Sequence, residues 1–231
     1  MTQIPQTVDV SKPSLPDSIS AVLRQQISSG VLKPGPVRII HLARQFNVSA
    51  VPIREALQQL AAEGLVSFDQ YKSVVVNSLS IDDMREIYEM RIALEPLAVT
   101  LAVPLIQQDP EILGSLRRMV DEMGECISDH DRWLELNSAF HWATYNVLDK
   151  PRLLRTVRSL WNAVEPYLRV YVIAALSLTD ANDEHRAMLE AITVGDKAQA
   201  ADLLRRHLLE TFEIVEEGLA ADPNRSEFAR H

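Results

Sequence analysis

The sequence predicts a mainly α-helical protein in two parts, a small helical domain with a β-hairpin followed by an all-helical bundle. Apolar residues recur at helical spacing along most of the 231 residues. Short valine-rich runs typical of strands occur only before residue 78. The balance of charge also changes there. Residues 1–78 carry 7 Lys and Arg against 5 Asp and Glu, whereas residues 79–231 carry 16 Lys and Arg against 27 Asp and Glu. Two domains with different partners would explain this asymmetry.

Composition limits the classes of protein that fit. A hydrophobic fraction of 47% supplies a core, while 7 glycines and 6% aromatic residues argue against a propeller or a glycine-rich barrel. The single cysteine, Cys126, excludes an intrachain disulfide framework and a cysteine-rich zinc module. No apolar run approaches the roughly 20 residues that span a bilayer, and the N-terminus lacks a signal-peptide pattern. We therefore expect a soluble, cytoplasmic protein with no membrane partner.

The first part is expected to begin with three helices. Residues 1–14 are polar and contain two prolines, so we expect a flexible tail there. Apolar residues then follow a helical period until Gly30, and the pair Pro34-Gly35 marks a turn. The expected helices cover residues 15–29, 39–46 and 50–63.

A tight turn and a hairpin complete this part. Ser49 stands where its side chain can cap the third helix, and Pro52 lies in the first turn, where a missing N–H costs little. Beyond Gly64, the runs LVSF and SVVVN predict two strands around the polar bend 69–72. Helix, short helix, turn, helix and hairpin over residues 15–78 is the order of a winged helix-turn-helix domain.

This order suggests a nucleic-acid interface. In a helix-turn-helix domain the N-terminal end of the recognition helix enters the major groove. The residues at that end are Ser49, Ala50, Val51 and Arg54, and the arginine could bind a phosphate or a guanine edge. Lys72, at the hairpin tip, could reach a neighbouring phosphate. The alternative is a protein-interaction domain with a solvated Arg54, because such modules share this geometry.

From Ser80 onward the pattern is helical throughout. Ser80 can cap a long helix that starts at Ile81, and two aspartates lie in its first turn, where the helix dipole favours them. Breaks at Asp109-Pro110, Lys150-Pro151 and Gly195-Asp196 separate the further helices. These are expected at about 110–130, 131–147, 152–176, 180–194 and 196–219. The bundle therefore covers residues 79–220, and residues 221–231 are expected to form a flexible C-terminal tail.

Four polar residues of the bundle form a candidate metal site. Asn137 and His141 are four residues apart and share one helix face. His185 lies ten residues before Gly195 and His207 eleven after Asp196, so an antiparallel helix pair brings both imidazoles to one level. Three nitrogens and one oxygen suit a divalent ion such as Zn²⁺ or Ni²⁺. Each histidine taken alone is more often a core or boundary residue.

Two long stretches resemble a known family. The segment ISSGVLKPG…LARQFNVSAVPIREALQQLAAEGLV resembles the DNA-binding domain of the GntR family of bacterial transcription regulators. The segment LSIDDMREIYEMRIALEPLAVTLA is similar to the opening helix of the FCD ligand-binding domain of the FadR-like subgroup. The resemblance covers about residues 15–219. It implies a homodimer that binds an inverted repeat in double-stranded DNA and responds to a small organic-acid effector.

Site residues carry over from this resemblance with three departures. Arg54 matches the family's arginine and Lys72 matches a basic wing residue loosely, whereas Ala50 stands where an arginine is usual and Ser73 where glycine is usual. These two changes imply a different operator or a lower affinity. In the FCD pattern all three histidines match, in NSAFH, DEHRAMLEAI and RRHLL. Asn137 replaces the usual aspartate, which implies a weaker metal site or one that an anionic effector completes.

Arg91 lies in the R-x-x-L-E element of the first bundle helix. Its guanidinium could bind an effector carboxylate, or it could pair with Glu95 one turn further on. The pattern supports both equally.

The leading functional hypothesis is a metabolite-responsive transcription regulator, a repressor of a catabolic operon. The rival is a metal-dependent hydrolase or lyase that activates water on the histidine cluster. That reaction needs a general base beside the metal, and Glu184, next to His185, points about 100° away on a helix. A helical interaction protein with a structural metal leaves the segment VPIREAL unexplained. We therefore expect no enzymatic activity.

Overall fold

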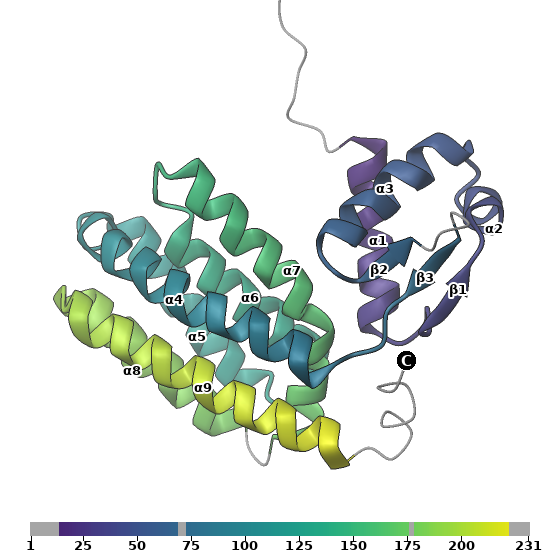
Figure 1. The fold of residues 1–231 in the computed structure, drawn as a ribbon. Helices are drawn as coiled ribbons and strands as arrows, with labels where there is room; N and C mark the ends of the chain where they lie inside the picture. The colour runs from purple at the N-terminus through teal and green to yellow at the C-terminus, as the bar shows by residue number, and fades with distance from the viewer. Residues whose placement is uncertain (1–13, 69–72, 176–177, 222–231) are drawn as a thin grey trace, which may run out of the picture. The chain divides into compact units, whose positions relative to one another are not determined.

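The computed structural model describes residues 14–68, 73–175 and 178–221, and the predicted mainly α-helical fold is confirmed (Figure 1). The chain divides into two compact units between Asn77 and Ser78. Each unit has its own cluster of buried hydrophobic side chains. Both tails, residues 1–14 and 221–231, were predicted to be flexible, and they lie outside the described residues except at Ser14 and Ala221.

The first unit contains three helices and a three-stranded antiparallel sheet. The helices are α1 (Leu15–Ser28), α2 (Ile39–Gln45) and α3 (Ala50–Ala62). The strands are β1 (Gly35–Val37), β2 (Val66–Phe68) and β3 (Val74–Val76), in the order β1-β3-β2. In the register, Val76 of β3 lies opposite both Gly35 and Val66. The two hairpin strands were predicted, but β1 was not.

Strand β1 replaces part of the turn that the Pro34-Gly35 pair predicted. Three residues are too few to show an alternating pattern, and one of them is Pro36, which cannot donate to a ladder. An edge strand tolerates a proline whose missing N–H would face away from the sheet. Pairing with β3 therefore determines this strand, and local sequence does not.

The turn between α2 and α3 depends on Asn47, whose φ of 52° is in the left-handed region. A short polar side chain tolerates this conformation better than most, and it allows Val48 to donate its backbone N–H to the carbonyl of Ala43. Ser49 occupies the N-cap position of α3, but its side chain makes no capping hydrogen bond. The prediction that this side chain caps the helix is therefore wrong. The backbone of Ser49 has the extended conformation of an N-cap residue, and the helix begins after it without a side-chain hydrogen bond.

The second unit is a bundle of six helices in the described part of the chain. They are α4 (Ile81–Ile106), α5 (Pro110–Glu125), α6 (His130–Tyr145), α7 (Pro151–Ala174), α8 (Leu178–Val194) and α9 (Lys197–Ala221). Ser80 caps α4 by accepting from the N–H of Asp83, as predicted. Helix α5 ends about five residues earlier than predicted, since Asp129 accepts from the N–H of Arg132 and starts α6.

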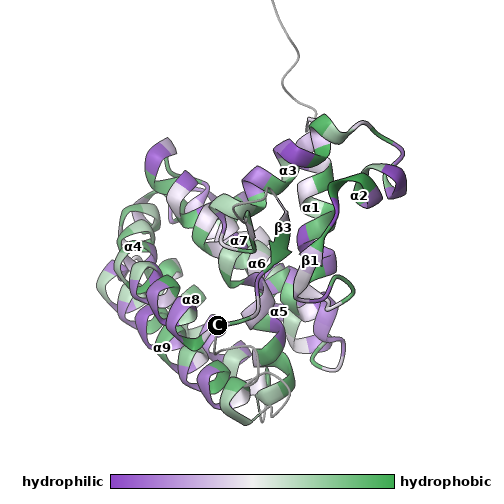
Figure 2. Ribbon diagram, turned by 45° about the vertical axis from the view of Figure 1, so that its right-hand side comes forward, coloured by the Kyte–Doolittle hydropathy of each residue, from purple (hydrophilic) through white to green (hydrophobic). Residues whose placement is uncertain are grey.

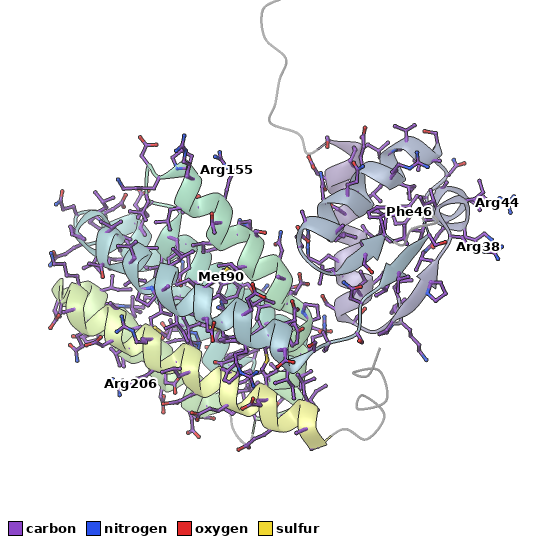
Figure 3. All side chains as sticks on the ribbon, viewed as in Figure 1. Arg38, Arg44, Phe46, Met90, Arg155 and Arg206 are labelled. Carbon is purple, nitrogen blue, oxygen red and sulfur yellow. The ribbon has the colours of Figure 1, made fainter. Side chains whose placement is uncertain are left out.

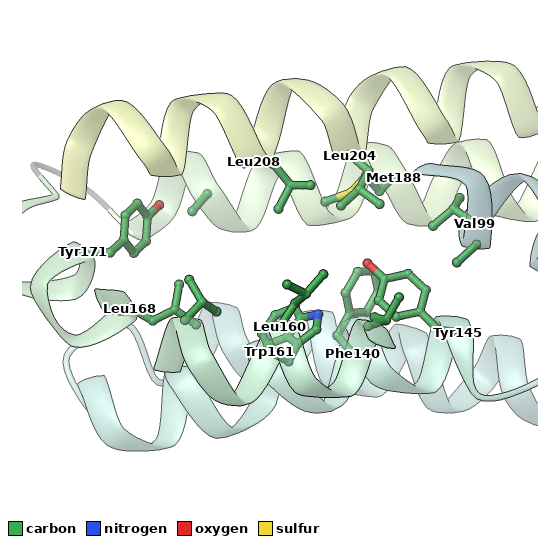
Figure 4. Close-up of a cluster of buried hydrophobic side chains, with 14 of the residues drawn as sticks. Val99, Phe140, Tyr145, Leu160, Trp161, Leu168, Tyr171, Met188, Leu204 and Leu208 are labelled. Carbon is green, nitrogen blue, oxygen red and sulfur yellow. The ribbon is translucent and has the colours of Figure 1, made fainter. Parts of the chain in front are cut away.

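Helix α4 runs through the bundle against α9, α7 and α6. Its contacts with α9 are antiparallel, because Arg85 pairs with Glu216 while the ring of Tyr88 meets that of Phe212. Figure 2 shows hydrophilic and hydrophobic segments alternating along these helices, as expected when each helix has a buried face. Aromatic and aliphatic side chains fill the space between the layers (Figure 4). No helix within the described ranges has the length and apolar character of a membrane span.

Candidate metal and effector site and the DNA-binding helices

Three histidines from three helices meet in the core of the bundle. His141 of α6, His185 of α8 and His207 of α9 are buried, and one ligand atom from each lies within 4.8 Å of the other two. The Nε2 atoms of His141 and His185 are 3.1 Å apart. The structure therefore brings together the three imidazoles that the sequence spacing predicted as metal ligands.

The hairpin of α8 and α9 positions two of these histidines. Gly195, with a φ of 80°, ends α8, and Asp196 accepts from the N–H of Gln199 in the first turn of α9. The two helices pack along their length, so residues at equal distances from the turn lie side by side. His185 and His207 are such a pair, with ring centroids 4.7 Å apart.

Asn137 lies one helical turn before His141 on α6 and is 4% exposed. Its Oδ1 atom is buried and accepts no hydrogen bond from any described residue. A buried acceptor without a donor costs about 1–3 kcal/mol, so native structures rarely leave one unless something else satisfies it. An amide oxygen in this position is a suitable ligand for a cation.

The protonation state of the imidazoles also suits a metal. Burial, together with the neighbouring His185 and His207, holds the pKa of His141 well below its ordinary value. Burial likewise lowers the pKa of His185, and His207 adds to this effect. Neutral imidazoles keep a lone pair for a metal. The three imidazole nitrogens are therefore a donor set that could hold a metal ion, and the amide oxygen of Asn137 lies one helical turn before His141.

Oxygen atoms orient two of the rings from outside. Nδ1 of His207 lies 2.5 Å from Oε2 of Glu184, and the hydroxyl of Tyr145 lies 3.4 Å from Nδ1 of His141. These contacts leave Nε2 of both rings for the centre of the cluster. Burial acts to raise the pKa of Glu184, but hydrogen bonds with His207 and Glu210 hold it below its ordinary value. The sequence predicted that Glu184 points away from the site, and only the packing of α9 on α8 places it beside His207.

Arg91 is 2% exposed and pairs with Glu95, one of the two alternatives that the sequence left open. Its Nε donates to Oε1 of Glu95 at 2.6 Å, and the hydroxyl of Tyr145 donates to Oε2 of the same carboxylate at 2.6 Å. Burial opposes the charge, yet Glu95 keeps the pKa of Arg91 above its ordinary value. The pair does not use the whole guanidinium, because the buried Nη1 has no hydrogen-bond partner among the described residues.

Two aromatic rings flank this guanidinium. The carbon Cζ of Arg91 is 4.9 Å from the ring centroid of Tyr88 and 4.5 Å from that of Trp161. The indole ring of Trp161 is in turn 5.3 Å from the imidazole of His141. The Tyr88 hydroxyl and the Trp161 Nε1 are also buried without a hydrogen-bond partner in the described structure. Three buried groups that can donate, all without a partner among the described residues, thus belong to Arg91 and the two rings that flank it, and one of these rings contacts His141.

A small cavity adjoins the same cluster. His141 and Thr144 are its polar lining residues, and the rest of its wall is apolar: Val99, Phe140, Met188, Ile192, Ala200 and Leu204. The cluster, the three donors and the cavity belong to one region of the bundle core.

The predicted DNA-contact residues of the first unit lie at the N-terminal end of α3. Ser49, Ala50, Val51 and Arg54 are all exposed there, while Ile53 on the opposite face is fully buried. Lys72, the predicted wing contact, lies outside the described residues.

Helix α2 adds basic side chains that the sequence reasoning missed. Arg38, His41 and Arg44 are exposed, and Figure 3 shows both arginines projecting outward. The signal was their spacing of three residues, which places them on one face opposite the buried pair Leu42 and Ala43.

The sequence relationships of the chain agree with this geometry. Residues 15–76 match the family described as bacterial regulatory proteins, gntR family, and residues 86–210 match the FCD domain. The chain belongs to the GntR family of bacterial regulators. The FCD match covers more than half of the sequence and contains Arg91 and the whole histidine cluster.

Relatives of this GntR regulator match over most of their length. The HTH-type transcriptional repressor GlaR of Escherichia coli is 27% identical over 210 residues, which cover 87% of this chain and 95% of GlaR. A probable D-xylose utilization operon transcriptional repressor of Paenarthrobacter nicotinovorans is 30% identical over 191 residues, 79% of this chain and 80% of the relative. The solved structure of E. coli McbR/YncC has a TM-score of 0.76 at 26% identity and covers 89% of this chain and 99% of its own.

These matches decide between the functional classes. The GntR family consists of DNA-binding transcription regulators, so this chain is a regulator and not an enzyme. The hydrolase or lyase alternative and the alternative of an interaction domain without DNA are both set aside.

Proposed function

We propose that this GntR regulator, a member of the FadR-like subgroup, is a cytoplasmic homodimeric repressor of a catabolic operon. Its helical unit binds a divalent ion and a small organic acid, and this binding changes its affinity for the operator. The observation that carries the proposal is the histidine cluster together with the three buried groups around Arg91 that can donate and find no partner in the described part of the chain. Relatives described as repressors of D-xylose utilization and gluconate operons support the repressor role.

The operator contact is assigned to the first unit. The exposed end of α3 presents Ser49, Ala50, Val51 and Arg54 to the major groove, with Lys72 of the wing as a phosphate contact. Arg54 is the residue able to read a guanine bidentately. A homodimer places two such helices on the half-sites of an inverted repeat.

The metal is assigned to Asn137, His141, His185 and His207. Zn²⁺ and Ni²⁺ suit this donor set, and the ion supplies positive charge and open coordination positions for an anion. Asn137 contributes a neutral oxygen, where an aspartate would contribute a negative charge. A carboxylate effector therefore adds the anionic ligand that the protein itself does not provide.

The effector is assigned to the part of the bundle core that holds the histidine cluster and Arg91. Nη1 of Arg91 and Nε1 of Trp161 can only donate and the Tyr88 hydroxyl can donate, so together they fit the oxygens of a carboxylate, and the charge of Arg91 disfavours a cation. The pair with Glu95 holds the guanidinium in place without using this edge. Such a ligand regulates DNA binding only if it favours one of two arrangements of the protein.

A binding assay tests the proposal as a whole. Fluorescence anisotropy measures the affinity of the full chain for a duplex that carries an inverted repeat from the DNA flanking its own gene. We expect at least tenfold preference over a scrambled duplex, and a change in affinity with one member of a panel of mono-, di- and tricarboxylates. The carboxylate effect is expected with Zn²⁺-loaded protein and not after chelation. Equal binding to both duplexes contradicts the DNA assignment, and an identical carboxylate response after chelation contradicts the metal assignment.

A further inference from the structure

A chain of polar contacts runs through the bundle core from Arg91 to His141. Nε of Arg91 donates to Oε1 of Glu95 at 2.6 Å, and the hydroxyl of Tyr145 lies 2.6 Å from Oε2 of the same carboxylate. The hydroxyl oxygen is also 3.4 Å from Nδ1 of His141. All four side chains are at most 2% exposed, so water competes little for these contacts. Tyr145 is one of the buried side chains labelled in Figure 4.

The hydroxyl of Tyr145 has one hydrogen and two neighbours that could accept it. The guanidinium of Arg91 keeps the Glu95 carboxylate charged, because a nearby opposite charge favours the charged form. A charged acceptor binds a hydroxyl more strongly and at a shorter distance than a neutral acceptor does. The distance of 2.6 Å to Glu95, against 3.4 Å to His141, therefore places the hydrogen on the side of the carboxylate.

This direction determines which nitrogen of His141 carries a hydrogen. Burial, together with the neighbouring His185 and His207, holds the pKa of His141 well below its ordinary value, so the neutral ring carries a single hydrogen. The Tyr145 oxygen faces Nδ1 as an acceptor, and a hydrogen on Nδ1 satisfies it. The other tautomer would set two lone pairs against each other. Nε2, 3.1 Å from Nε2 of His185, thus keeps its lone pair.

We propose that Glu95 is a positioning residue for metal binding, which sets the tautomer of His141 through the hydroxyl of Tyr145. The inference rests on the proposed function, in which His141 is a metal ligand. A histidine binds a metal through a nitrogen that carries no hydrogen. A tautomer fixed in advance removes the cost of moving that hydrogen before the ion can bind. We name this pair of side chains the Glu95–Tyr145 relay.

The relay gives His141 what Glu184 gives His207. A carboxylate or another oxygen commonly holds the outer nitrogen of a metal-binding histidine. Glu184 contacts Nδ1 of His207 directly, at 2.5 Å, whereas the carboxylate behind His141 acts through one hydroxyl. Glu95 lies on α4 and His141 on α6, so the relay forms only when these two helices pack together. It also joins Arg91, assigned to the effector, to a ligand of the metal.

Solid-state NMR of the full chain tests the relay in the absence of metal. Protein labelled with ¹⁵N and ¹³C only at its six histidines is treated with chelator at pH 7.5, and the shifts of the ring nitrogens show which of them carries a hydrogen. The signals of His141 are assigned by their loss in His141→Gln. We expect the hydrogen on Nδ1 in the wild type. A hydrogen on Nε2 of His141 in the wild type overturns the proposal.

Tyr145→Phe removes the hydroxyl and keeps the ring. Nδ1 of His141 then loses its acceptor, so we expect the hydrogen to move to Nε2, which can donate it to Nε2 of His185. The matched control is Tyr171→Phe, which removes the hydroxyl of another buried ring and should retain the hydrogen on Nδ1. The relay is wrong if Tyr145→Phe keeps the tautomer of the wild type.

Glu95→Gln should reverse the direction of the relay. The amide oxygen faces the donor of Arg91, and the amide nitrogen then donates to the oxygen of Tyr145. The hydroxyl turns its hydrogen towards Nδ1 of His141, and we expect the imidazole hydrogen on Nε2. A hydrogen that stays on Nδ1 in the folded variant contradicts the role of Glu95. Thermal unfolding checks the fold, since Arg91 loses its partner charge, and Tyr145→Phe decides alone if this variant does not fold.

Competition with a chromogenic chelator measures the consequence for Zn²⁺. Tyr145→Phe should bind Zn²⁺ about tenfold more weakly than the wild type, and Tyr171→Phe should bind it equally well. An altered tautomer with unchanged Zn²⁺ affinity overturns the positioning role. A wild type that binds no Zn²⁺ overturns the proposed metal site instead, and the tautomer measured in the chelated protein still decides whether the relay exists.

Discussion

Nδ1 of His207 lies 2.5 Å from Oε2 of Glu184, the residue that directly precedes His185 in the chain. Helix α8 thus provides one imidazole of the cluster and, one residue earlier, the carboxylate that orients the imidazole of α9. A carboxylate on the outer nitrogen of a metal-binding histidine fixes its tautomer and its direction. The contact also shows why Glu184 is unsuited to act as a free general base.

Replacing this carboxylate should weaken metal binding without affecting folding. For Glu184→Gln we expect the affinity for Zn²⁺ to fall about 10- to 100-fold, because the neutral amide oxygen is a weaker acceptor for Nδ1–H of His207 than the carboxylate. Competition with a chromogenic chelator measures the affinity, and thermal unfolding of the chelated protein provides the folding control. Glu190→Gln, an exposed glutamate on the same helix, should behave as the wild type. Equal affinities in both variants would show that Glu184 has no role in the centre.

The four assigned ligands should control the metal content. His185→Ala and His207→Ala are expected to lose the ion, whereas Asn137→Asp should bind it more tightly because an aspartate adds a negative charge. Elemental analysis after purification without chelator gives the content, and titration gives the affinity. His130→Ala, an exposed histidine outside the cluster, is the matched control. Unchanged metal content in both alanine variants would end the metal assignment.

Acid should destabilise the chelated protein through the buried histidines. Burial holds the pKa of His141 and His185 well below the ordinary 6.5, so below about pH 6.5 the unfolded chain binds more protons than the folded one. The contribution of these histidines therefore leaves the free energy of unfolding undiminished above this pH and lowers it as the pH decreases. Urea unfolding at pH 7.5 and 5.0 should show a smaller loss for His185→Gln than for the wild type or His130→Gln. Identical losses in all three proteins would contradict this origin.

The effector role of Arg91 needs a variant that keeps its positive charge. Arg91→Ala would leave Glu95 buried without its cation, at a cost of about 3–5 kcal/mol. Arg91→Lys keeps the charge but removes the free guanidinium edge, so we expect at least tenfold weaker carboxylate binding with the metal retained. Calorimetry with the active carboxylate measures this effect, and Arg85→Lys on the same helix is the control. Wild-type affinity in Arg91→Lys would limit Arg91 to the ion pair with Glu95.

Arg54 of α3 and the two exposed arginines at the ends of α2 should affect DNA binding differently. Arg54→Ala is expected to lose about 1–3 kcal/mol of operator affinity if the side chain reads a base, and its exposure predicts normal folding. Arg38→Ala and Arg44→Ala should each weaken binding to the operator and to the scrambled duplex alike. Each should also reduce the slope of log affinity against log salt concentration by about one. Arg117→Ala, exposed on α5, controls for the loss of a charge. Operator affinity that is unchanged in Arg54→Ala would remove this residue from the interface.

Much of the architecture is encoded in local patterns of the chain. Helical periodicity predicted the helices, since an element with a repeat of 3.6 residues shows its buried face in its own sequence. The positions of His185 and His207 around Gly195 predicted their meeting, because a helical hairpin converts equal sequence distances into equal heights. The R-x-x-L-E spacing likewise placed Arg91 and Glu95 on one face of α4.

The remaining features depend on contacts between segments far apart in the sequence. Strand β1 exists through its pairing with β3, and Glu184 reaches His207 only because α9 packs on α8. The pairing of Arg91 with Glu95 was open in the sequence, since a local spacing permits an ion pair but burial and neighbouring rings decide whether it forms. The sequence by itself thus determined which helices form and which faces they bury. The tertiary structure decided which polar groups find partners, because hydrogen bonds and desolvation depend on distances of a few ångströms across the packed core.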